Sequence, residues 1–132
     1  MAIEDTTTPP TPIVNMEKPF GVINIKSHIP LVLDLDHLNY DAWCELFTSH
    51  CHSFSVHGLL DGTYMPTSET PDEWKKLDSL VKVWIYGTIS TSLLQTVLKR
   101  NVTAKDVWKS LAIFFIITKK HAQWNTMKNF GP

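Results

Sequence analysis

The feature of this sequence that most restricts its fold is the return of large apolar residues at helical spacing. Asn39 is a residue type that caps helices, and the apolar side chains that follow it recur at steps of three, four, four and three residues. These steps place them on one face of an α-helix. The spacing predicts an amphipathic helix that starts after Asn39 and is ended by Gly58. Its apolar face would consist of Tyr40, Trp43, Phe47, Cys51 and Phe54.

A second helix is predicted to start at Thr70. Pro71 suits the first helical position, and Thr70 with Glu73 has the spacing of a capping box. The opposite, solvated face would hold two acid–base pairs at i,i+4 spacing, Asp72/Lys76 and Asp78/Lys82. The apolar face would consist of Trp74, Leu77, Val81, Trp84, Ile85 and Thr88.

Two further helices are predicted towards the C-terminus. A short one would turn Leu93, Leu94, Val97 and Leu98 inward, and the spacing of Thr103 and Asp106 resembles another capping box. The pattern contains no hairpin signal and no repeat at solenoid spacing. The sequence therefore predicts an all-α fold, a small bundle of about four to five amphipathic helices. The last helix would bury Val107, Trp108, Leu111 and either Phe114 or Phe115.

The chain before Asn39 divides into two parts. Residues 1–28 are predicted to form a flexible, disordered N-terminal arm, because they include a Thr/Pro-rich tract with no apolar period. Residues 29–132 are predicted to form the helical domain. Its first segment, Ile29 to Leu35, alternates like a strand, yet no strand partner follows it. We expect this segment to be extended and docked on the helices.

Composition places the chain among ordinary globular domains. Its 132 residues suit one domain with a core, and two cysteines are too few for a disulfide scaffold. No secretory signal is visible in the first thirty residues. The longest apolar run, residues 112–117, is much shorter than the ~20 residues that span a bilayer. These features predict a cytoplasmic, non-secreted protein that makes no membrane contact.

Charge is distributed unevenly along the chain. Residues 1–98 hold five basic and twelve acidic residues, a net charge of −7, whereas residues 99–132 hold seven basic and one acidic residue, a net charge of +6. This division favours solvated helix faces with cations near helix ends, a basic tail for nucleic acid, or head-to-tail attraction between copies. The RNA-binding candidates are Lys99, Arg100, Lys119 and Lys120.

The apolar run at residues 112–117 bears on partners. Its six residues would cover every side of a helix, and only one side can be buried within the same domain. The remainder has to meet another surface, which favours self-association into a homo-oligomer. A fully buried central helix or a short strand is the alternative. The predicted interface residues are Phe114, Phe115, Ile116 and Ile117.

No catalytic or metal chemistry is expected. The stretch from Cys44 to His57 is rich in zinc-ligand types, but Cys44 and Cys51 would lie two helical turns apart, about 10 Å, which is too far to share one ion. Thiols in mid-helix beside an apolar face are normally inert, and no Gly-rich phosphate loop is present. We therefore expect no enzyme activity, no cofactor, no metal and no small-molecule substrate.

Four segments occur in an order that resembles a known family. They read "LDLDHLNYDAWCELFTSHCHSF", "LLDGTY", "PDEWKKLDSLVKVWIYGTIS" and "LLQTVLKRNVTAKDVWKSL". Their order and spacing are similar to the N-terminal Gag (capsid-type) region of plant copia-type LTR retrotransposon polyproteins. The resemblance covers roughly residues 29 to 115. The residues that match are Asn39, Tyr40, Trp43, Asp61, Gly62, Trp74, Trp84, Ile85, Thr103, Ala104, Trp108 and Leu111.

The resemblance implies a helical, non-enzymatic module that self-associates into particles that package RNA. Its partner would be itself or a full-length Gag relative. After Phe115 the chain departs from the family pattern, which continues with a charged helix, further helices and a zinc knuckle of C-x2-C-x4-H-x4-C spacing. The departure indicates a truncated or degenerate copy. An RNA-binding remnant or a non-functional relic of an element are the alternative interpretations.

Overall fold

Helices make up the regular structure of the described part of the chain. This computed structural model describes residues 17–22 and 24–129, with side chains for residues 18–22 and 24–118. The helices of seven or more residues are α3 (Tyr40–Ser53), α5 (Pro71–Tyr86), α6 (Thr91–Val97) and α7 (Ala104–Asn129). Shorter turns are α1 (Glu17–Phe20), α2 (Ile25–His28), the 3-10 turn η2 (Leu35–His37) and α4 (Gly58–Asp61). The all-α prediction is confirmed.

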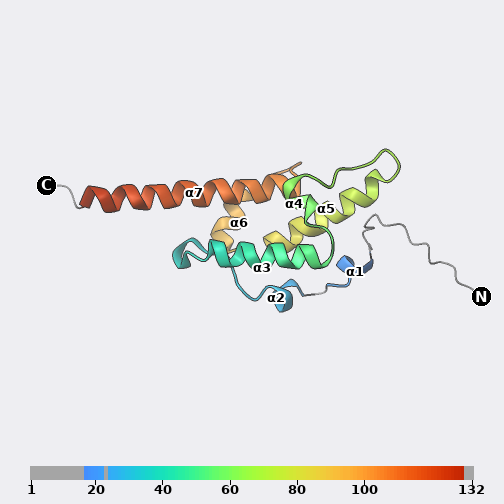
Figure 1. Ribbon diagram of the computed structural model, residues 1–132, viewed down its shortest axis with the longest axis horizontal. Helices are drawn as coiled ribbons and strands as arrows, with labels where there is room; N and C mark the ends of the chain where they lie inside the picture. Colours follow the sequence, from blue (N-terminus) through green and yellow to red (C-terminus); the bar gives the residue numbers. More distant parts are fainter. Residues whose placement is uncertain (1–16, 23, 130–132) are drawn as a thin grey trace, which may run out of the picture.

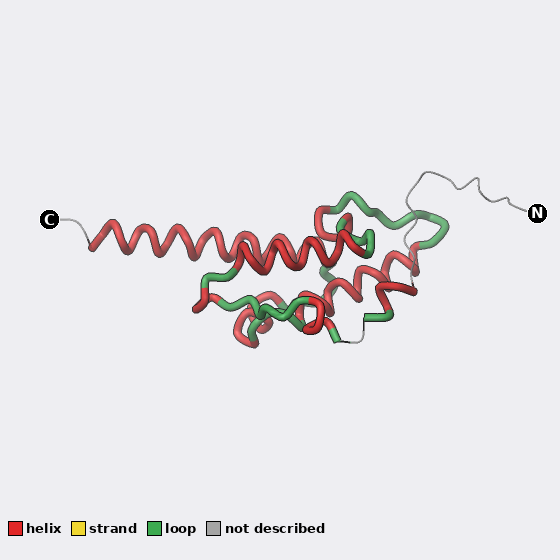
Figure 2. Tube along the Cα trace, turned by 60° about the horizontal axis from the view of Figure 1, so that its bottom comes forward, coloured by secondary structure: helices red, strands yellow, loops and turns green. Residues whose placement is uncertain are grey.

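The longer helices α3, α5 and α6 pack with the first part of α7, and the rest of α7 projects from this body. The first part of α7 packs on α4, α5 and α6, and α1 packs on α5 (Figure 1). The C-terminal half of α7 extends beyond the other helices in both views (Figures 1 and 2). The longest helix is therefore only partly covered by its own domain.

The core lies where the apolar helix faces meet. Trp43 and Phe47 of α3 are fully buried, and the Trp108 ring of α7 lies 5.3 Å from Trp43 and 5.4 Å from Phe47, between ring centroids. Tilted aromatic pairs at this distance add to the stabilisation from buried area. The other fully buried large side chains are Ile29, Leu33, Val56, Leu59, Leu77, Val81, Trp84, Ile85, Leu93 and Leu111.

The segment from Ile29 to Leu35 is held against the turn between α5 and α6. The Leu33 N–H donates to the Thr88 carbonyl at 2.9 Å, and the Ser90 N–H donates to the Leu33 carbonyl at 2.8 Å. The Thr88 hydroxyl also accepts from Trp43 Nε1–H at 3.1 Å. The predicted docking of this segment on the helices is thus found at Leu33, whereas Leu35, predicted to be extended, belongs to the 3-10 turn η2. The only β-type pairing among the described residues is this isolated bridge between Leu33 and Ile89.

Two one-turn helices lie within residues 1–28, the stretch predicted as a flexible N-terminal arm. Residues 17–20 and 25–28 form the one-turn helices α1 and α2, and Pro19 is buried. The Asn24 side chain accepts from the Lys26 N–H at 3.1 Å, which caps α2. Residues 1–16 and residue 23 lie outside the described part of the chain, and the prediction of disorder for them stays a prediction.

Two predicted cap residues directly precede their helices, but their side chains make no capping hydrogen bond. Asn39 precedes α3 without capping it, because its side chain instead accepts from the Asp34 N–H at 3.0 Å and donates to the Val32 carbonyl at 2.8 Å. Thr70 precedes α5, yet its N–H and hydroxyl pair with the hydroxyl of Thr67. Both residues therefore stabilise the chain before the helix and leave the first turn uncapped by a side chain.

The capping box at the start of α7 is confirmed, and two residues of α5 reinforce it. The Thr103 N–H donates to the Asp106 carboxylate at 2.9 Å, and the Asp106 N–H donates to the Thr103 hydroxyl at 3.2 Å. Asp78 accepts from the Ala104 N–H at 3.0 Å, and Lys82 Nζ donates to the Val102 carbonyl at 2.8 Å. The prediction that Asp78 and Lys82 form a solvated pair is wrong, because Asp78 is buried.

The prediction that Gly58 ends a helix is wrong. Gly58 is instead the first residue of α4. A Cβ atom added to Gly58 would lie 2.7 Å from Tyr64 Cβ and 2.9 Å from the Tyr64 backbone nitrogen. The Tyr64 N–H donates to the Gly58 carbonyl at 3.0 Å, so the two backbones are held at this close approach. The position therefore has no room for a side chain.

Gly58→Ala is expected to lower the free energy of unfolding by about 1–3 kcal/mol, because the clash is with backbone that cannot move aside. Gly87→Ala is the matched control. Its Cβ atom would approach the Ile25 side chain at 3.2 Å, and its backbone already has helical angles. Urea unfolding of both variants measures the difference, and equal midpoints would contradict the steric account.

Candidate interaction surface

The two faces of α7 have different roles. Phe115 is only 7 % exposed, and its ring stacks on Tyr40 at a centroid distance of 4.7 Å and an interplanar angle of 13°. Leu111 and Val107, about one and two turns earlier, are buried on the same face. Phe115 is therefore a core residue, and its prediction as an interface residue is wrong. Phe114 is half-buried against the core.

The opposite side of α7 presents three isoleucines to solvent. Ile113, Ile116 and Ile117 are 47 %, 53 % and 61 % exposed. Their i, i+3 and i+4 spacing places them on one face, which we call the α7 isoleucine face. The predicted residues Ile116 and Ile117 lie on it. Ile113 was missed by the sequence analysis, although its spacing from Ile116 and Ile117 is the signal that links it to them.

The predicted basic residues do not form a defined site. Lys99 and Arg100 are exposed in the connection between α6 and α7. Lys119 and Lys120 belong to α7, but their side chains lie outside the described residues. RNA binding by this group stays a prediction.

The cysteines show no sign of activation as nucleophiles. Burial raises the pKa of the Cys51 thiol to about 12, and burial also raises the pKa of Cys44 above its ordinary value. Both thiols are free, and because their pKa values are raised they are protonated at neutral pH, a state that is a poor nucleophile. Within the described residues, no three His, Cys, Asp or Glu side chains gather as a metal site.

His50 is the one buried histidine of the described chain. Its ring packs edge-on against Trp84, with 4.4 Å between centroids and an angle of 74°, and against Phe54 at 5.0 Å. Burial, and secondly the charge of His28, lower the pKa of His50 to about 4. No hydrogen-bond partner reaches His50 Nε2 among the described residues. These features suit a neutral core residue, and they make folding sensitive to acid.

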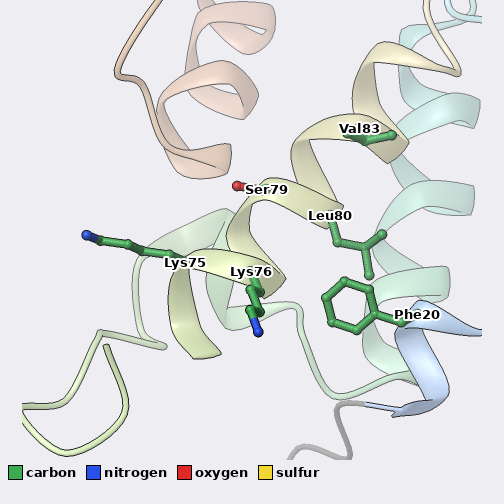
Figure 3. A pocket seen from close by; sticks show the side chains of 6 residues that line it. All are labelled: Phe20, Lys75, Lys76, Ser79, Leu80 and Val83. Atoms are coloured by element: carbon green, nitrogen blue, oxygen red, sulfur yellow. The ribbon is translucent and has the colours of Figure 1, made fainter. Parts of the chain in front are cut away.

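A shallow, open groove of about 440 Å³ lies between α1 and α5. The Phe20 ring of α1 faces Leu80 of α5, and Lys75 and Lys76 extend outward from the earlier part of α5 (Figure 3). Ser79 and Val83 complete the lining. We call this the α1/α5 groove. It is too open to enclose a small molecule, because ligand sites bury most of the ligand surface.

Known proteins give no further guide to this surface. No family model, no curated protein and no solved structure matches the chain. In the part of the chain that the structure describes, no helix is long and apolar enough to cross a bilayer.

Proposed function

We propose that the chain is a structural, non-catalytic module that self-associates through the α7 isoleucine face. The observation that carries the proposal is the exposure of Ile113, Ile116 and Ile117 on a helix whose other face is already buried in the core. Contiguous exposed apolar side chains on a helix are typical of a surface that meets a partner. The resemblance to a copia-type Gag region supports a second copy as that partner.

A symmetric contact is the simplest arrangement for such a face. When the same patch of two copies meets, every contact occurs twice, and the association stops at a pair. A patch of about 400 Å² per partner corresponds to a gross ~20 kcal/mol at ~25 cal/mol per Å². Most of this is offset by the loss of free motion and by side-chain ordering, so the proposed association is weak and depends on concentration.

The test is Ile116→Glu combined with Ile117→Glu, measured by light scattering after size-exclusion chromatography over roughly a hundredfold range of concentration. The native chain is expected to gain mass with concentration, and the double variant to gain less because two charges would have to be desolvated in the contact. Met65→Glu is the control, since Met65 is an exposed apolar residue in another part of the chain.

The interpretation requires that each variant stays folded, which far-UV circular dichroism checks. Phe115→Glu is unsuitable for this test, because Phe115 is buried and the variant would unfold for reasons unrelated to assembly. Equal masses for the native chain and the double variant at every concentration would overturn the proposal.

A further inference from the structure

A second surface of the molecule combines an apolar floor with positive charge. In the α1/α5 groove, Phe20 and Val83 are 46 % and 60 % exposed, and Leu80 lies between them, partly buried. Lys75 and Lys76 line the same groove. The acidic residues of the first turn of α5 are outside the lining. The groove therefore suits an apolar side chain that is flanked by carboxylates.

The chain itself presents such a side chain immediately before α3. Leu38 is 79 % exposed, more than any other large hydrophobic residue described. Its backbone is left-handed, with φ 47°, a conformation that bulky non-glycine residues rarely adopt. Three carboxylates, those of Asp34, Asp36 and Asp41, belong to the same stretch, which we call the Leu38 turn (residues 34–41).

The Leu38 turn is held by several polar contacts of its own residues. The Asp34 carboxylate accepts from the Asp36 N–H at 2.9 Å and lies 3.5 Å from the His37 ring nitrogen. Asn39 ties the turn to Val32 and Asp34 by the two hydrogen bonds described above. Since the turn is already ordered, little conformational entropy would be lost if Leu38 entered a partner. Within its own chain, the exposed Leu38 side chain gains little from burial.

We propose that the Leu38 turn of one copy docks into the α1/α5 groove of a second copy. Leu38 would contact Phe20, Leu80 and Val83, and Asp36 and Asp41 would face Lys75 and Lys76. The two patches differ and lie on separate elements of the body, so the contact is heterologous. Copies then join into open chains, or into rings where the rotation between neighbours closes. This inference is independent of the α7 isoleucine face.

The experiment uses the full chain with Ile116→Glu and Ile117→Glu, so that the proposed α7 contact is absent. Sedimentation velocity is measured over roughly a hundredfold range of concentration. Two charge reversals are added separately, Lys75→Glu/Lys76→Glu in the groove and Asp36→Lys/Asp41→Lys in the turn. Each is expected to weaken association about tenfold or more, because two attractive pairs become repulsive.

Mixing the two charge-reversed proteins is the decisive arm. In the mixture each groove meets a turn of opposite charge in the other protein, so growth with concentration is expected to return, whereas each protein alone stays monomeric. Leu38→Asn tests the apolar part. It is expected to abolish growth without unfolding the chain, because asparagine tolerates left-handed backbone better than leucine does.

Three results would overturn the inference. The first is a monomer at all concentrations in the starting protein. The second is growth that neither charge reversal changes, or that mixing fails to restore. The third is growth that appears only after residues 1–16 are deleted, since that would make the N-terminal segment the occupant of the groove. None of them decides the proposal for α7, which is tested by Ile116→Glu and Ile117→Glu in the otherwise native chain.

Discussion

Replacement of Trp43 by alanine is expected to lower the free energy of unfolding by about 3–5 kcal/mol. Trp43 is fully buried, and its ring packs on Phe47 and Trp108 at centroid distances of 5.0 and 5.3 Å. The alanine variant would leave a cavity among these rings. It would also remove the donor to the Thr88 hydroxyl, at the point where the segment before η2 joins the turn after α5.

Thermal and urea unfolding measure this loss. A domain of this size loses roughly 4 °C in Tm per kcal/mol, so a fall of roughly 12–20 °C is expected. Trp43→Phe should cost less, since it keeps an aromatic ring and loses the hydrogen bond and part of the volume. Leu46→Ala is the matched control from the same helix, because Leu46 is exposed. If Trp43→Ala had the same Tm and the same urea midpoint as Leu46→Ala, the position of Trp43 in the core would be contradicted.

Mild acid is expected to destabilise the protein through His50. The pKa of His50 is lowered from 6.5 to about 4, first by burial and second by the charge of His28. Between these two pH values the unfolded chain binds a proton that the folded chain excludes, so stability falls as pH falls through this window. One pKa unit corresponds to about 1.4 kcal/mol, and His50 should therefore account for a loss of about 1.5 kcal/mol between pH 6.5 and pH 5.

The variant that isolates this effect is His50→Phe. It keeps an aromatic ring against Phe54 and Trp84 and removes the buried nitrogen that has no partner. Urea unfolding at pH 6.5 and pH 5 should show a smaller loss for His50→Phe than for the native chain. His52→Gln is the control, because His52 is an exposed histidine of the same helix and its variant should keep the full loss. Parallel losses in all three proteins would exclude His50 as the source.

The helix positions could be predicted because each apolar face has its own period. Trp43 and Phe47 fix the phase of α3, and Val81, Trp84 and Ile85 fix that of α5, so the buried side of each followed from spacing alone. The run at residues 112–117 contains six apolar residues in succession, so its pattern does not indicate which side of the helix is buried. Sequence alone did not distinguish Phe115, which is buried against Tyr40, from Ile113, which faces solvent.

Polar roles were harder to predict, because they depend on partners that are distant in sequence. Asp78 matched the local rule for a surface ion pair with Lys82, yet its partner is the N–H of Ala104, 26 positions away. The exposed position of Leu38 in the Leu38 turn could not be predicted from the sequence either. Its acidic residues are ordinary in number, and only the structure shows a leucine held outward among them with left-handed backbone.

The attachment of Leu33 to Thr88 and Ser90 has a consequence for the order of folding. These hydrogen bonds close a loop of about 55 residues, whose closure costs on the order of 3–4 kcal/mol of chain entropy. The backbone hydrogen bonds within α3 and α5 are local in sequence, so these helical turns do not require the loop to be closed. The segment around Leu33 can join only after α5 and the turn that follows it exist. During synthesis, the segment around Leu33 therefore stays undocked, with Ile29 and Leu33 exposed to solvent, until Thr88 and Ser90 have been added.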